Sequence, residues 1–202
     1  NFCSNDLSSF YFDIRKDSIY CDSIKSKKRR SARTLLDLVF NYLVRWLAPS
    51  LSFTCEEAWK SRGNKNSIHL EDFLKAKDEY KNIKINDKWI IIKNIRKIIT
   101  GALEKKRAEK IIGSSLEAHI KIYVSDEIKI KIKDIQFDEI AITSSFEILN
   151  FEDNNKYFCN EDIKNIGVEV MKVGGSKCNR CWKYKNNLKN KDICERCEEV
   201  IK

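Results

Sequence analysis

The chain has 202 residues, of which 42% are hydrophobic, enough for one or two domains with buried cores. Its 39 lysines and arginines outnumber its 30 acidic residues, and the formal net charge of +9 favours a polyanionic partner such as nucleic acid. No apolar run approaches the roughly 18 to 20 residues of a membrane span, and the first residues lack the pattern of a signal peptide. We therefore expect a cytoplasmic protein with no membrane partner.

The first predicted element is an amphipathic helix over residues 27–47, where hydrophobic side chains recur at intervals of three and four. Pro49 should end it, because proline cannot continue a helix without losing a backbone hydrogen bond. A second helix is expected to begin at Thr54, since Thr54 and Glu57 have the spacing of a capping box. The start of the chain is therefore predicted to be helical.

A longer helix follows, and we expect Asp87 to cap it and Gly113 to end it. Its inward face should carry Trp89, Ile92, Ile95, Ile99, Ala102 and Leu103. Trp46 and Trp59 also lie on apolar stripes, so we expect all three tryptophans in the core. Residues 1–113 are thus interpreted as a helical bundle.

After Gly113 the hydrophobic period changes to two, which predicts a strand containing Ile120, Ile122 and Val124. Residues 126–135 fit a strand and a helix equally well. Further strands are predicted at residues 140–143, 146–149 and 167–173. These elements predict a small α/β domain over residues 114–173, followed by a cysteine segment at residues 174–202.

Four cysteines near the end of the chain form two pairs, Cys178-x2-Cys181 and Cys194-x2-Cys197. Two such knuckles can place four thiolates at the corners of a tetrahedron around zinc. Because all four positions would be filled by protein, the sequence predicts one structural zinc ion and no zinc chemistry. A redox pair or an iron–sulfur site is less consistent with this setting and spacing. The remaining cysteines are scattered, as expected for reduced, partly buried side chains: Cys3, Cys21, Cys55 and Cys159.

Several further segments resemble one family, in their order along the chain. They are residues 6–17 (DLSSFYFDIRKD), 20–22 (YCD), 46–49 (WLAP), 53–59 (FTCEEAW), 100–104 (TGALE), 112–118 (IGSSLEA), 177–183 (KCNRCWK) and 194–197 (CERC). Together they run nearly end to end and resemble the C-terminal region of bacterial isoleucyl-tRNA synthetases.

This resemblance implies an α+β protein with an anticodon-binding helical bundle (residues 1–113), an α/β junction domain (114–173) and a four-cysteine zinc knuckle (174–202). It implies isoleucine tRNA as the partner, rather than DNA, and a monomeric parent enzyme, an aminoacyl-tRNA ligase that uses ATP. The two histidines, His69 and His119, lie outside any His-Ile-Gly-His motif, and no Lys-Met-Ser-Lys-Ser loop or editing insertion occurs. We therefore expect no catalytic residue here, ATP only in the catalytic domain of the parent, and a start partway into the bundle.

The candidate tRNA-binding residues are cations that could meet phosphates and one aromatic residue that could stack on an unpaired base. They are Arg29, Arg30, Arg33, Arg96, Lys97, Lys105, Lys106, Arg107, Lys110, Arg180, Trp182 and Lys183. For Trp182, stacking on a base and packing over the knuckle are equally compatible with the sequence.

Two other functions share some of these features. A DNA-repair glycosylase can carry a zinc finger of similar cysteine spacing, but it attacks DNA through an N-terminal proline, whereas residue 1 here is Asn and the sole proline is Pro49. A zinc-stabilised protein-interaction module without RNA affinity is the third possibility.

Overall fold

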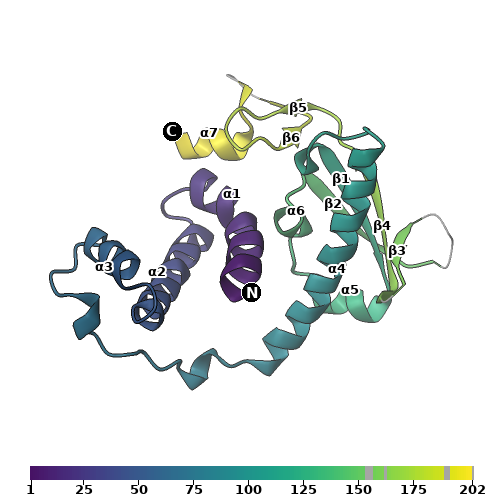
Figure 1. Cartoon of the computed structure of the whole chain (residues 1–202). Coiled ribbons are helices and arrows are strands. Elements are labelled where there is room, and N and C mark those ends of the chain that lie inside the picture. The colour runs from purple at the N-terminus through teal and green to yellow at the C-terminus, as the bar shows by residue number, and fades with distance from the viewer. Residues whose placement is uncertain (153–156, 162, 189–191, 202) are drawn as a thin grey trace. The chain divides into compact units, whose positions relative to one another are not determined.

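The computed structural model describes residues 1–152, 157–161, 163–188 and 192–201. The chain forms two compact units (Figure 1). The sheet unit comprises Asn1–Asp22 and Ile83–Lys202, and the helical unit comprises Ser23–Asn82. In the described residues, no helix is both long and apolar enough to cross a membrane.

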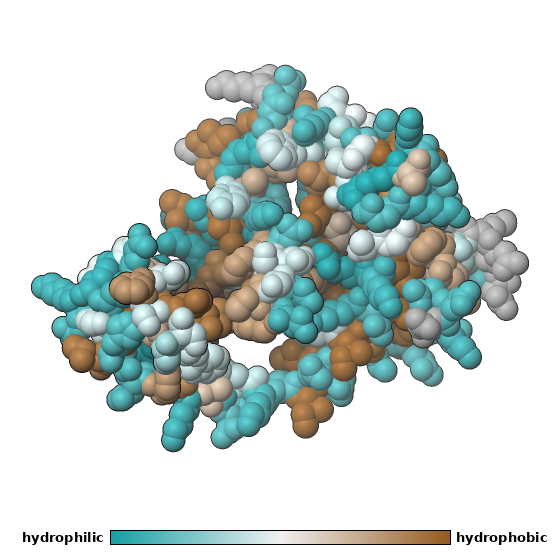
Figure 2. All heavy atoms as spheres, in the orientation of Figure 1, coloured by the Kyte–Doolittle hydropathy of each residue, from teal (hydrophilic) through white to brown (hydrophobic). Residues whose placement is uncertain are grey.

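The helical unit is built from α2 (Lys27–Leu47) and α3 (Ser52–Ser61), followed by 3-10 turns at Ile68–Leu70 and Asp78–Tyr80. The predicted amphipathic helix is confirmed, and Ser26 caps it by accepting a hydrogen bond from the Arg29 amide. The small core contains Val44, Ala48, Cys55, Trp59 and Ile68. Figure 2 shows hydrophobic patches among the hydrophilic side chains of this unit.

Two predictions for the helical unit are wrong. Helix α3 begins at Ser52 rather than Thr54, and no side chain caps it. The neighbouring Glu56 accepts hydrogen bonds from the Ile68 amide (2.8 Å) and the Ser67 hydroxyl (2.9 Å), so it joins α3 to the following loop rather than capping the helix. Trp59 is 5% exposed, as predicted for a core residue. Trp46 is 46% exposed and lies outside the small core, and its indole donates to the backbone carbonyl of Leu74.

The sheet unit begins with a π-helix (Phe2–Phe12) and α1 (Asp13–Cys21), and after the helical unit it continues with α4 (Ile83–Ala108) and a 3-10 turn at Ser115–Glu117. Four strands follow in the spatial order β2-β1-β4-β3. They are β1 (Ala118–Val124), β2 (Ser145–Asn150), β3 (Phe158–Asn160) and β4 (Ile163–Lys172). Strand β1 is parallel to β2 and antiparallel to β4, and β3 is antiparallel to β4.

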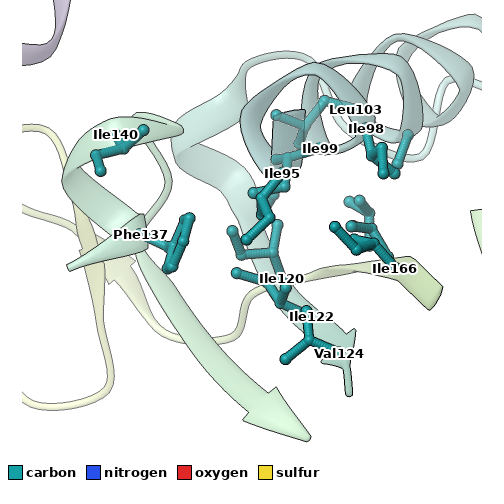
Figure 3. Packing of buried hydrophobic residues seen from close by; sticks show 14 of the residues in the cluster. Ile95, Ile98, Ile99, Leu103, Ile120, Ile122, Val124, Phe137, Ile140 and Ile166 are labelled. Carbon is teal, nitrogen blue, oxygen red and sulfur yellow. The ribbon is translucent and has the colours of Figure 1, made fainter. Parts of the chain in front are cut away.

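The main core lies between α4 and the sheet. The predicted alternation on β1 is confirmed, because Ile120, Ile122 and Val124 are fully buried. Figure 3 shows isoleucines of α4 pointing toward this row, with Phe137 beside it. The α4 stripe is also as predicted, with Trp89 packed at its edge. The predicted α+β fold class is therefore confirmed.

The connection from β1 to β2 is helical, which settles one open question and corrects one prediction. Residues in the ambiguous segment form α5 (Asp126–Ile132), and α6 (Phe137–Ile140) follows. The strand predicted at residues 140–143 is wrong, since Ile140 ends α6 and Ile142 turns the chain with a φ of 57°. The reason is topological, because two parallel neighbouring strands need a crossover connection between them.

Helix α4 is longer at its start and shorter at its end than predicted. It begins at Ile83 rather than at an Asp87 cap and ends at Ala108, before Gly113. Lys110 adopts a φ of 57°, its amide donates to Arg107, and the Ile111 amide donates to Lys106. This is a Schellman ending, with lysine in the position that glycine usually occupies. Helix α4 packs on the sheet, so it belongs to the sheet unit and not to the helical unit. The predicted division into residues 1–113, 114–173 and 174–202 therefore differs from the two compact units, and it stays a prediction.

Candidate metal centre and nucleic-acid interface

The four cysteines of the two predicted knuckles come together in one cluster. Their sulfur atoms all lie within 4.8 Å of one another, and the Sγ atoms of Cys181 and Cys194 are 3.7 Å apart. A tetrahedral zinc ion with bonds of about 2.3 Å would separate its sulfur ligands by about 3.8 Å. The cluster therefore has the dimensions that a four-coordinate metal ion requires.

Local backbone geometry brings the knuckles together. The hairpin of β5 (Ser176–Lys177) and β6 (Tyr184–Lys185) carries the first pair of cysteines, and α7 (Glu195–Ile201) begins within the second pair. The Cys194 amide donates to the Cys178 sulfur at 3.3 Å, and the Asn179 amide donates to the Asp192 carbonyl at 3.0 Å. We call residues 176–201 the cysteine module.

The electrostatics of the cluster favour a bound cation. Burial raises the pKa of Cys178, but backbone N–H groups of Cys181, Cys194 and Arg180 outweigh it and lower the pKa to about 6. Burial and neighbouring thiol groups raise the pKa of Cys181. Four thiolates in one buried cluster cannot all ionise without a compensating positive charge, and a divalent cation supplies it. The donor set therefore fits zinc.

Charged side chains attach the cysteine module to the rest of the sheet unit. Arg196 binds Asp17 through two hydrogen bonds of 2.7 Å each, and the Arg180 guanidinium donates to the carbonyls of Cys21 (2.6 Å) and Tyr20 (3.3 Å) at the end of α1. The Arg196 contact, against the opposing effect of burial, holds the pKa of Asp17 below its usual range. These contacts join the module to the C-terminus of α1.

Lys183 makes the third attachment, to α6. Its ammonium group lies 2.7 Å from Asp138 Oδ2, and its side chain is only 9% exposed. The sequence predicted Lys183 and Arg180 as tRNA contacts because both are basic and lie beside the ligand cysteines. In the structure both charged groups have internal partners.

Trp182 lies at the rim of a cavity of about 490 Å³ between α1, α6 and the cysteine module. The Trp182 side chain is 58% exposed, and Tyr20 at the same cavity is 74% exposed. The Lys177 ammonium group lies 5.0 Å from the centre of the Trp182 ring. The indole is therefore accessible from solvent, as stacking on a base would require.

The other candidate cations fall into two groups. Arg96 donates to the Ile140 carbonyl and lies over the Phe10 ring, while Lys106 and Arg107 pair with Glu109 and Glu104 on α4. Arg29 is half-buried and also has a partner. The second group is exposed, and in the described part of the chain no carboxylate lies within ion-pair distance of its members: Arg30, Arg33, Lys97, Lys105 and Lys110.

One cation near these candidates was missed by sequence reasoning. Arg62 directly follows α3 and pairs with Asp37 of α2, so that it lies in the same hollow as Arg30 and Arg33. In the sequence Arg62 stands at the start of a polar stretch that predicts a loop. Nothing there indicates that it lies close to Asp37, because the two residues are 25 positions apart.

Comparison with known proteins adds independent information. Residues 1–122 match the family model described as the anticodon-binding domain of tRNA ligase. Among curated relatives, the chain is 40% identical over 190 residues to an isoleucine–tRNA ligase of Bartonella henselae and 43% identical over 197 residues to one of Pelagibacter ubique. These matches cover 93% and 97% of the chain, but it spans only about 20% of the length of each relative.

Proposed function

The chain belongs to the family of anticodon-binding domains of tRNA ligases, and from this premise we propose that it binds the anticodon region of isoleucine tRNA. Its parent enzyme would attach isoleucine to that tRNA using ATP. The observation that carries the proposal is the 40% identity to isoleucine–tRNA ligases over 93% of the chain. The net charge of +9 supports a polyanionic partner. The DNA-glycosylase and protein-interaction alternatives are not favoured by these relatives.

We further propose that Cys178, Cys181, Cys194 and Cys197 hold one zinc ion. The compact sulfur cluster and the local backbone hydrogen bonds support this assignment. With four protein ligands no coordination position is left for water or substrate, so the ion would stabilise the cysteine module and take no part in the chemistry. We propose no catalytic residue among residues 1–202.

The proposed RNA contacts follow from accessibility. Exposed cations without internal carboxylate partners would meet phosphates, and Trp182 would stack on an unpaired base. Those cations are Arg30, Arg33, Lys97, Lys105 and Lys110. Candidates that are buried or only partly exposed, and that also have internal partners, would support the surface instead, because RNA could reach them only by displacing a contact already made: Arg29, Arg96, Lys106, Arg107, Arg180 and Lys183.

A binding titration tests this function. The zinc-loaded protein is titrated with isoleucine tRNA, with the same tRNA carrying a changed anticodon, and with an unrelated tRNA, at several salt concentrations. We expect the first to bind most tightly, with a logarithmic salt slope of about −0.7 per single-strand phosphate contacted. Equal affinity for all three RNAs at physiological salt would contradict the specificity. Absence of RNA binding would favour the protein-interaction module, and a borohydride-trapped DNA adduct would favour the glycosylase.

A further inference from the structure

Three arginines line a hollow of about 570 Å³ on the helical unit. Arg30 and Arg33 come from α2, and Arg62 comes from the residue that follows α3. The remaining lining residues include the hydroxyl-bearing Thr34 and the acidic Asp37. The hollow therefore lies wholly within one compact unit and combines elements that are distant in sequence.

Helical spacing explains how α2 supplies one wall. Arg33, Thr34 and Asp37 follow Arg30 by three, four and seven positions, so the four residues lie on one face of the helix. The hydroxyl of Thr34 donates to the Arg30 carbonyl at 3.0 Å, and the guanidinium groups are left at the surface.

Arg62 is held in place on the opposite wall. It pairs with Asp37, and its guanidinium carbon lies 5.3 Å from the centre of the Phe40 ring. The ring and the carboxylate orient the planar guanidinium group, while about half of the side chain stays exposed. A ligand can therefore reach Arg62 without unfolding the unit.

The charges in the hollow are unbalanced. Three guanidinium groups face one carboxylate, which leaves a local charge of +2, and in the described residues Arg30 and Arg33 have no side-chain hydrogen bond or ion pair. Like charges three positions apart on a helix repel each other. An anion in the hollow would relieve this repulsion, and the arginine fork matches the oxygens of a phosphate group in particular.

We propose that this hollow is a phosphate-binding site, that its ligand is a backbone phosphate of the bound RNA, and that Arg62 is a contact residue. The identity of the ligand as RNA rests on the proposed function, whereas the affinity for phosphate does not. Asp37 has the opposite effect, because its carboxylate repels the phosphate and competes for Arg62. Asp37 therefore weakens binding at this site.

The test uses three variants with opposite expectations. Arg62→Gln should lower the affinity for isoleucine tRNA about threefold to tenfold and reduce the salt slope by about one. Asp37→Asn should raise the affinity about twofold to fivefold, an effect that a purely structural ion pair would not produce. Lys65→Gln is the matched control, because it also removes one exposed cation of the helical unit but lies outside the hollow, and it should change the affinity less than twofold. Thermal unfolding checks that every variant is folded.

A second measurement separates this inference from the proposed function. Inorganic phosphate is titrated into the protein while the arginine side-chain N–H resonances are followed by NMR. We expect shifts at the hollow in the wild type that are lost in Arg62→Gln. If no RNA binds but these shifts occur, the proposed function fails and the anion site stands. Two results would show that the hollow is not a phosphate site. In the first, RNA binds, but Asp37→Asn does not raise the affinity and Arg62→Gln leaves the salt slope unchanged. In the second, inorganic phosphate causes no shift of the arginine resonances.

Discussion

The ion pair between Lys183 and Asp138 should be worth more to stability than any other single polar contact of the cysteine module. Its two side chains are 9% and 19% exposed, and Oδ1 of Asp138 has no hydrogen-bond partner in the described structure. Replacing Lys183 with Met would leave the whole carboxylate nearly buried without a cation. Removing one partner of a fully buried pair costs about 3 to 5 kcal/mol. Because Asp138 keeps some contact with water, we expect a loss of about 2 to 3 kcal/mol.

Urea unfolding of the zinc-saturated protein measures this loss. Adding Asp138→Asn to Lys183→Met should recover part of it, since the uncompensated charge is then gone. Lys185→Met is the control, because Lys185 is exposed on the neighbouring strand, and it should stay within about 0.5 kcal/mol of the wild type. The tRNA salt slope of folded Lys183→Met should equal that of the wild type. A stability unchanged by Lys183→Met, or a salt slope reduced by about one, would refute this reasoning and place the ammonium group at a phosphate.

Three further predictions concern the metal, a turn and a tyrosine. Elemental analysis should find one zinc per chain. Cys197→Ser should weaken zinc binding about a hundredfold, since a zinc-binding free energy of about 10 kcal/mol is shared among four ligands. An unchanged zinc affinity would contradict the proposed ligand set. Gly175→Ala should weaken zinc binding far more than the control Gly174→Ala. Gly175 has a φ of 89°, and an added Cβ would lie 2.4 Å from the Lys185 carbonyl oxygen. At Gly174 the atom nearest to an added Cβ is 3.8 Å away. Burial and the hydroxyl's hydrogen bond to Glu169 raise the pKa of Tyr123 to about 12. The contribution of Tyr123 to the free energy of unfolding should therefore be constant below pH 10 and be lost as the pH rises toward 12. Phenolate absorbance checks this, with Tyr123→Phe as the control; a pKa near 10 would contradict it.

Local patterns in the sequence determined much of the fold. The alternation of Ile120, Ile122 and Val124, the stripe of α4 and the paired cysteines each depend on neighbours within one element or turn, so their spacing alone predicts a strand, a buried helix face and a metal cluster. Family-specific segments also identified the relatives that the comparisons found.

The tertiary structure decided which connection between strands is helical and which basic side chains are free to meet a ligand. The segment at residues 140–143 is apolar enough for a strand, but the parallel pairing of β1 with β2 makes their connection helical. Lys183 and Arg62 are both basic in the sequence, yet one is buried against Asp138 and the other lines an open hollow with Arg30 and Arg33. Their partners lie 45 and 25 residues away, and no local period encodes a contact over such a separation. Only the packed chain distinguishes a lysine that stabilises the fold from an arginine that can bind a phosphate.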